Sequence, residues 1–270
     1  MSEPWWAEQD LELGQGLRVT AGPLQVVAFR REDEWQLTWG PAPTGGGDGS
    51  VSTVERLVEP YEESAELERY ALRAETTRVR ILPVMPDRPI VVKPRVALFV
   101  PPGESIQIYV SSPLWAQVTV GEPWRILREI PVKRLSDTWF GGSTLDGEVA
   151  YAIRTQARIQ LSEISARPHR AVTPVVIRNH SDDTLPVERF NLPVTYLSVY
   201  AGENGRLWTE NIVMTRGEGG EMAGLEVEPG APREAGEAEQ LTEPREASET
   251  NILVRAFSNL LDPFLGGDDD

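Results

Sequence analysis

The stretch VAYAIRTQARIQL, residues 149–161, changes character at every second position. A period of two places alternate side chains on opposite faces of a β-strand. The sequence therefore predicts one long strand with a buried face and a solvated face, as in an antiparallel sheet. The face predicted to be buried holds Val149, Tyr151, Ile153, Thr155, Ala157, Ile159 and Leu161.

Outward from this stretch, short strand patterns recur with turn residues between them. Short strands separated by turn signals are typical of a β-sandwich. We therefore expect an all-β chain, an antiparallel β-sandwich of two packed layers or subdomains. The three clearest hairpins join 24–30 to 35–39, 172–178 to 185–192, and 196–200 to 206–214. We expect an N-terminal β-rich subdomain over 1–125 and a C-terminal sandwich over 126–216; whether they form one continuous body stays open.

The formal net charge of −16 is unevenly distributed. Residues 217–250 alone hold ten Glu and two Arg, and few large apolar side chains. Such a composition cannot bury enough apolar surface to order a chain. We therefore predict that residues 217–249 form an acidic, disordered linker.

Apolar side chains return near the C-terminus at the spacing of one helix face. This pattern predicts a short amphipathic helix over 250–265, which the acidic linker would tether to the rest of the chain. The helix either folds back on its own sandwich or docks on a partner protein. Its docking residues would be Ile252, Leu253, Phe257, Leu260, Leu261 and Phe264.

The composition also argues against several classes of function. The chain has no cysteine, so disulfides, thiolate metal sites and a cysteine nucleophile are excluded. No basic patch is evident in the sequence, which argues against nucleic acid as a ligand. The sequence shows no signal-peptide pattern and no apolar run long enough to cross a bilayer, so we expect a cytoplasmic protein without direct membrane insertion. A metal site with His169 and His180 would need Asp182 and Asp183 to complete it. Residues 179–183 also have the composition of an ordinary hairpin loop, so we expect no metal and no cofactor.

The most individual motif is DTWFG, residues 137–141. Its structural interpretation is a corner between two β-layers. In such a corner the two aromatic side chains would fill the core and the two polar ones would bond to nearby amides. Its functional interpretation is a ligand site. The residues concerned are Asp137, Thr138, Trp139, Phe140 and Gly141.

Two further functions involve this region. Asp137, Asp146 and Glu148 could supply the paired carboxylates of a hydrolase acting on sugars. Alternatively, some of the eight tryptophans could stack on sugar rings, which would make the chain a carbohydrate-binding β-sandwich.

The stretches LSDTWFGGSTLDGEVAYAIRT, FVPPGESIQIYVSSPLWAQVTVG and TPVVIRNHSDDTLPVERFNLPVTYLSVYAGENGRLWTE resemble the family called domain of unknown function 432, found in archaea and bacteria. The resemblance covers roughly residues 75–215. It implies no established activity and no catalytic residues. Because genes of the family can lie beside genes of mechanosensitive channels, the resemblance implies a membrane-channel partner as an expectation.

These observations lead to one main expectation. The protein is expected to be a non-enzymatic interaction module or adaptor, associated with a protein partner such as a mechanosensitive-type channel. The sugar-acting hydrolase and the carbohydrate-binding sandwich are the alternatives.

Overall fold

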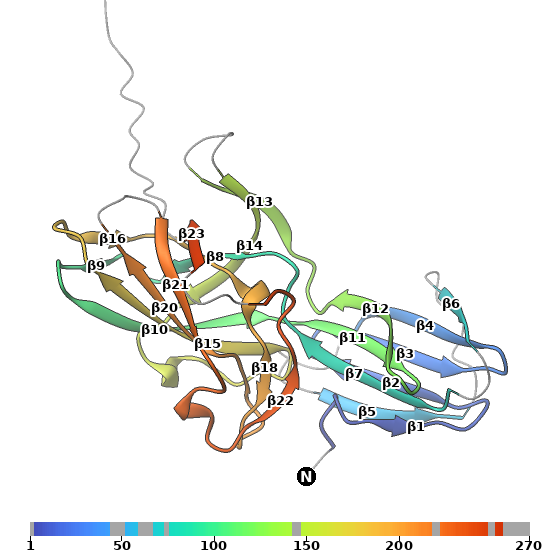
Figure 1. Cartoon of the computed structure of the whole chain (residues 1–270). Coiled ribbons are helices and arrows are strands. Elements are labelled where there is room, and N and C mark those ends of the chain that lie inside the picture. The colour runs from blue at the N-terminus through green and yellow to red at the C-terminus, as the bar shows by residue number, and fades with distance from the viewer. Residues whose placement is uncertain are drawn as a thin grey trace, which may run out of the picture.

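The computed structural model describes residues 3–43, 52–58, 67–72, 76–141, 147–217, 222–247 and 252–255. For residues 153–156, 222, 223 and 252–255 it describes the backbone alone. Within these ranges the chain forms β-strands and three short 3-10 helices, η1 (Leu161–Glu163), η2 (Val194–Tyr196) and η3 (Arg233–Ala235), which confirms the all-β prediction. The strands gather into two bodies, here called the N-terminal and the C-terminal sandwich (Figure 1).

The N-terminal sandwich packs two antiparallel sheets face to face around one apolar core. One sheet has the order β5-β2-β3-β4-β6, and the other has the order β1-β7-β11-β12. Side chains that alternate along the strands meet between the sheets, as in other sandwiches. The strands are β1 (Gln9–Asp10), β2 (Gly16–Ala21), β3 (Leu24–Arg30), β4 (Glu34–Pro41), β5 (Ser52–Leu57), β6 (Leu67–Ala71), β7 (Arg78–Val84), β11 (Trp115–Val120) and β12 (Arg125–Pro131).

A second apolar core lies in the C-terminal sandwich. Its large sheet follows β22-β18-β19-β15-β20-β21-β23, with β10 also paired to β15, and smaller sheets are β13-β14-β8-β17 and β16-β9. Three of its strand pairs, β14–β8, β15–β19 and β15–β20, are parallel, so the antiparallel prediction holds for most pairs but not all. The strands are β8 (Ile90–Pro94), β9 (Leu98–Val100), β10 (Ser105–Pro113), β13 (Ser136–Gly141), β14 (Gly147–Ala157), β15 (Arg170–Asn179), β16 (Leu185–Val187), β17 (Phe190–Leu192), β18 (Val199–Ala201), β19 (Leu207–Trp208), β20 (Asn211–Arg216), β21 (Met222–Glu228), β22 (Glu239–Thr242) and β23 (Ile252–Arg255).

Two of the three expected hairpins are present. β3 pairs with β4, and β18 pairs with β19, both antiparallel. The third is wrong, because β15 lies between β10 and the parallel strands β19 and β20, whereas β16 pairs with β9 and β17 with β8. The five-residue loop after β15 thus leads to another sheet instead of back along the same one.

The chain passes between the two sandwiches more than once. After β7 it enters the C-terminal sandwich for β8, β9 and β10, returns for the β11–β12 hairpin, and then leaves again for β13. The subdomain division expected between residues 125 and 126 therefore falls inside β12, which pairs with β11 along most of its length. Each sandwich combines segments that are distant in sequence.

The predicted disordered linker is wrong for residues 222–247. β21 pairs with β20, and β22 pairs with β18. The acidic composition concealed an alternation in residues 225–228, where Leu225 is buried and Val227 packs on the core while Glu226 and Glu228 face solvent. A segment with few apolar residues can still form a strand when all of them fall on one face.

The predicted C-terminal helix is also wrong where the structure describes it. Residues 252–255 form β23, which pairs antiparallel with β21. Ile252 and Leu253 are therefore strand residues, because the edge of β21 offers backbone hydrogen bonds that a short isolated helix must provide for itself. Phe257, Leu260, Leu261 and Phe264 lie outside the described residues.

Side chains from distant segments fasten the two sandwiches together. The Trp5 indole Nε1, in the N-terminal core, donates to the carbonyl of Pro168 at 2.9 Å. Arg245, just after β22, donates to the Met85 carbonyl at 2.7 Å and forms a 2.7 Å ion pair with Glu129 on β12. Arg245, which was expected to lie in a disordered linker, is thus part of the junction between the two sandwiches.

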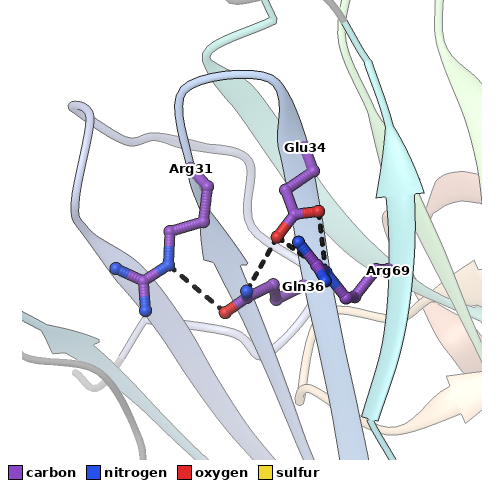
Figure 2. A network of polar contacts seen from close by, with 4 residues as sticks. All are labelled: Arg31, Glu34, Gln36 and Arg69. Carbon is purple, nitrogen blue, oxygen red and sulfur yellow. Dashed lines mark hydrogen bonds and ion pairs between the residues drawn. The ribbon is translucent and has the colours of Figure 1, made fainter.

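An outer strand of the N-terminal sandwich is held by a polar network, which Figure 2 shows. Arg69 on β6 donates from Nε to both carboxylate oxygens of Glu34 on β4, at 2.8 and 3.0 Å. Gln36 donates to the same carboxylate at 2.8 Å, and Arg31 donates to Gln36 at 3.3 Å. The hydrogen bond from Arg69, followed by that from Gln36, lowers the pKa of Glu34.

No helix among the described residues is both long and apolar enough to cross a membrane.

Candidate functional site

The DTWFG motif lies on a projecting hairpin, the arm, formed by β13 and the facing half of β14. Figure 1 shows it extending beyond the other strands. Antiparallel pairing runs from Ser136 opposite Ala152 to Gly141 opposite Gly147. The motif is therefore neither a buried corner nor a connection between layers. It is one strand of an outlying two-stranded ribbon.

The inner face of the arm is fixed to the C-terminal sandwich. Phe140 and Ala150 are fully buried and pack with Val91 of β8 in a small apolar cluster of their own. The guanidinium of Arg189 lies 5.3 Å from the centre of the Phe140 ring, which suits a cation–π contact. Phe140 thus fills an apolar site, as the sequence predicted.

Trp139 occupies the opposite, outer face, and its predicted burial is wrong. Its side chain is 43% exposed, and its cross-strand partner Val149 is 45% exposed. The indole lies against Gly147, where a Cβ atom would come within 2.4 Å of its Nε1. The ring therefore covers the glycine instead of entering the core. Together Trp139 and Val149 form an apolar pair open to solvent.

The burial predicted for the 149–161 strand is corrected as well. β14 ends at Ala157, and the 3-10 helix η1 follows at Leu161. Val149 and Ile159 are exposed, whereas Ala150, assigned to the solvated face, is fully buried. The reason is that the outer part of β14 has a partner layer on one side only, and it is the side of Ala150. Alternation identified the strand but assigned the wrong face to its outer part.

Four side chains at the base of the arm hold it in place. Asp137 accepts a hydrogen bond from Arg88 at 2.8 Å, and the Arg88 guanidinium lies 5.6 Å from the centre of the Tyr151 ring. The Tyr151 hydroxyl donates to Asp87 at 2.7 Å; burial, with this bond second, raises the pKa of Tyr151 to about 12. Asp137 was expected to bond to nearby amides but pairs with a side chain from another segment. Thr138 lies half-buried beside it.

The carboxylates considered for a hydrolase do not converge. Asp137 lies opposite Tyr151 and Glu148 lies opposite Phe140, so the two acids point to opposite faces of the ribbon. Glu148 also accepts a hydrogen bond from Asn191. Asp146 lies outside the described residues. A glycosidase needs two carboxyl groups flanking one bond, and Asp137 and Glu148 do not provide that arrangement.

The other sugar-binding prediction is not favoured either. Of the eight tryptophans, all within the described ranges, only Trp139 is exposed. Trp5, near the start of the chain, is 1% exposed. A row of exposed, coplanar rings that could stack on a sugar chain is therefore missing from this part of the chain. Among the described residues, no group of three or more histidine or acidic side chains could hold a metal ion.

A basic pocket of about 610 Å³ opens beside the base of the arm. Its lining includes Ser136 and Ala152, the pair that closes the arm at its base. Among the lining residues that the structure describes, Glu163 is the only acid. The five cations that define the basic pocket are Lys133, Arg134, Arg158, Arg167 and Arg170.

Sequence reasoning did not find this pocket, because its cations are scattered over nearly forty positions. A signal was present nevertheless. Residues 133–170 hold six basic and four acidic side chains, in a chain whose net charge is −16. The local excess of positive charge becomes a site only because the end of β14, η1 and the start of β15 meet the segment that precedes β13.

Comparison with known proteins identifies the family. A family model described as "Protein of unknown function (DUF432)" matches residues 5–262, nearly the whole chain, so the protein belongs to this family. The match extends well beyond the residues 75–215 on which the resemblance was recognised, and it includes both sandwiches and the strands β21 to β23. No curated protein and no solved structure shows a significant match.

Proposed function

We propose that this protein is a non-enzymatic interaction module that binds a protein partner through its arm. The observation that carries the proposal is the exposed Trp139–Val149 pair on the outer face of a projecting hairpin. Exposing an aromatic ring and a β-branched side chain side by side is unfavourable in water. Tryptophan is also the residue type that most often dominates the binding energy of protein interfaces.

The construction of the arm suits this role. Phe140 and Ala150 anchor its inner face, while the ion pair between Arg88 and Asp137 fixes its base. A hairpin held in this way loses little conformational freedom when it binds. Pre-organisation of this kind increases affinity because less ordering entropy is lost on association.

The surroundings of the pair suggest the chemistry of the partner. Lys133 and Arg134 are exposed just before β13, so the base of the arm is positively charged. We expect an apolar groove that receives Trp139 and Val149, with acidic residues at its rim. We further propose a cytoplasmic location, and the family resemblance suggests a mechanosensitive-type channel as the partner.

Because residues 222–247 are ordered, the proposed mechanism of partner binding differs from the tethered helix expected from the sequence. A tethered helix would have acted by raising its own local concentration, but β21 and β22 are parts of the large sheet. We instead assign partner binding to the arm, which is held in place on the C-terminal sandwich. Recognition then depends on the shape of the arm and not on the length of a flexible linker.

The test is affinity capture from detergent-solubilised native lysate with three full-length proteins: the wild type, Trp139→Ala and Phe99→Ala. Phe99 on β9 is 67% exposed and serves as the matched control for losing an exposed aromatic ring. We expect the wild type and the control to capture the same partner, and Trp139→Ala to lose it. With purified partner, the affinity of Trp139→Ala should fall by at least about tenfold, as expected for a central interface tryptophan. Equal capture by all three proteins would show that the arm does not bind the partner through Trp139, which would contradict the proposal.

A further inference from the structure

A short segment near the end of the described chain, residues 239–247, touches both sandwiches and is here called the strap. It begins with β22, which pairs with β18 of the C-terminal sandwich and contacts β7 of the N-terminal sandwich (Figure 1). After β22, the amides of Arg245 and Glu246 both donate to the Thr195 carbonyl, at 2.9 and 3.0 Å. The backbone of the strap is therefore attached to the C-terminal sandwich.

The side chains of the strap reach to the other sandwich. The Thr242 hydroxyl donates to the Pro83 carbonyl of β7 at 2.9 Å. Arg245 forms its ion pair with Glu129 of β12, and its guanidinium also lies 5.5 Å from the centre of the Trp115 ring of β11. The strap thus contacts three neighbouring strands of one sheet of the N-terminal sandwich.

These contacts lie on the outer face of that sheet. Ala116 and Ile130 belong to the core of the N-terminal sandwich. Trp115 and Glu129 precede them in β11 and β12, so they point to the opposite face. Trp5, which also joins the two sandwiches, is instead part of the core and is 1% exposed. The junction therefore combines one buried link with one superficial link.

The strap is the more weakly held of these two links. β22 is an outer strand of the large sheet, and its register with β18 shifts between Val199 and Tyr200. Residues 239–247 are all described by the structure, and none of their side chains is fully buried. Segments that bury little apolar surface open locally at a smaller cost in free energy than a protein core. The strap is therefore expected to open before either core unfolds.

The strap is also connected to the base of the arm. The ring centres of Trp115 and Tyr151 lie 6.4 Å apart, with the ring planes inclined at 46°. Tyr151 on β14 is the cross-strand partner of Asp137, and the Arg88 guanidinium lies against the Tyr151 ring. A continuous row of contacts thus runs from Arg245 through Trp115 and Tyr151 to the base of the arm.

We propose that the strap is a releasable fastening between the two sandwiches. Closed, it fixes the N-terminal sandwich against the C-terminal one. Open, it lets them turn relative to each other about the Trp5 contact while both cores stay folded, and the base of the arm loses the support of Trp115. This inference goes beyond the proposed function, because it concerns a movement within one chain and needs no partner.

The first measurement is hydrogen exchange of the full-length protein, read by mass spectrometry of its peptides. Amides of residues 239–247 should exchange at least about tenfold faster than those of β15, because they exchange by local opening. Arg245→Gln removes the charged contacts of the strap and should accelerate its exchange by about a further tenfold, with β15 unchanged. Arg233→Gln removes an exposed charge just before the strap and is the matched control, expected to behave as the wild type.

The second measurement tests whether opening moves the sandwiches. Because the chain has no cysteine, spin labels can be attached to Thr53→Cys on β5 and Ser105→Cys on β10, both exposed positions. Pulsed electron paramagnetic resonance then gives the distribution of distances between the labels. We expect a narrow distribution in the labelled protein and in Arg233→Gln, and a broader one in Arg245→Gln. Glu129→Gln should broaden it less, and replaces Arg245→Gln if that variant does not fold.

Three results would overturn the proposal. Exchange of the strap as slow as that of β15 would show that the strap opens only when the whole protein unfolds. An equal acceleration of the strap and β15 in Arg245→Gln would show that this arginine stabilises the entire fold. A distance distribution as narrow in Arg245→Gln as in the wild type would show that the sandwiches are held without the strap. None of these results bears on capture of a protein through Trp139, so the two proposals can fail separately.

Discussion

Two tryptophans on two hairpins of this protein have opposite environments. Trp35 on β4 of the β3–β4 hairpin is 1% exposed, and its indole Nε1 donates to Thr76 at 3.2 Å. Trp139 on β13 is 43% exposed and lies across a glycine of the neighbouring strand. Both belong to antiparallel ribbons with good strand residues. The difference lies in what covers each tryptophan. The second sheet packs on the face of β4 that carries Trp35, whereas the C-terminal sandwich packs on the face of the arm opposite to Trp139.

This comparison separates stability from function. A large side chain that a second sheet covers stabilises the fold strongly, whereas one that stays 43% exposed, as Trp139 does, contributes less to it. The free energy of burying Trp139 is therefore available to an encounter with another molecule. The two positions should respond to the same substitution in opposite ways.

The largest effect is expected from the pair Trp35→Ala and Trp139→Ala. Trp35→Ala should lower the free energy of unfolding by about 3–5 kcal/mol, because it leaves a cavity between two sheets. Trp139→Ala should change it by less than about 1 kcal/mol, because little burial is lost. Urea unfolding followed by circular dichroism measures both values. If Trp139→Ala proved as costly as Trp35→Ala, the arm would be a structural element and the contrast would disappear.

A smaller effect is expected where the arm supports its own tryptophan. At Gly147 a Cβ atom would lie 2.4 Å from Trp139 Nε1 and 2.8 Å from the Phe140 carbonyl oxygen. Gly147→Ala should therefore displace the indole and destabilise the protein by about 1 kcal/mol. The near-ultraviolet circular dichroism of the tryptophans should change as well.

Gly40→Ala, on β4 of the other hairpin, is the matched control, because a Cβ atom there meets nothing within 4 Å. It should leave both the spectrum and the stability close to those of the wild type. A normal spectrum for Gly147→Ala would show that the ring does not rest on the glycine.

The smallest effect concerns pH and the edge of the buried hairpin. The hydrogen bond from Arg69 lowers the pKa of Glu34 below its value in the unfolded chain, about 4.3. The stabilisation is therefore complete above that value and is lost as the pH falls through the lower, folded-state pKa. Amide hydrogen exchange in β6 should accelerate in this acid range, and Glu34→Gln should remove the acceleration. Glu32→Gln, in the preceding turn, is the control; an identical change in both variants would exclude the Glu34–Arg69 pair as its cause.

Local pattern was enough to predict the fold class and two of the hairpins. Residues 34–39 alternate, and a polar turn separates them from the apolar run at 26–29, so β3 and β4 follow from the sequence. Long-range pairing did not follow, since β16 and β17 pair with strands that lie many residues earlier. In residues 225–228 the average composition pointed to disorder, while the decisive feature was that Leu225 and Val227 share one face.

The candidate site was predicted only in part. The motif at 137–141 was identified as unusual, and the burial of Phe140 followed from its chemistry. The exposure of Trp139 could not be foreseen, because alternation shows that two neighbours point apart but not which of them meets the protein. The basic pocket depends on four separate segments, and no single stretch of sequence contains it.

The interleaved path of the chain has a consequence during synthesis. The core of the N-terminal sandwich includes Val118 and Ile130, so it stays incomplete until β11 and β12 have left the ribosome. By then β8, β9 and β10 have already emerged, while β15, which forms nine register pairs with β10, has not yet been made. Three unpaired strands must therefore wait beside a closing sandwich, exposed to pairing with other nascent chains. Because the chain is synthesised from its N-terminus, a protein with this topology should depend on chaperones that hold unfolded segments. This dependence should be greater than for a sandwich formed by one continuous stretch of sequence.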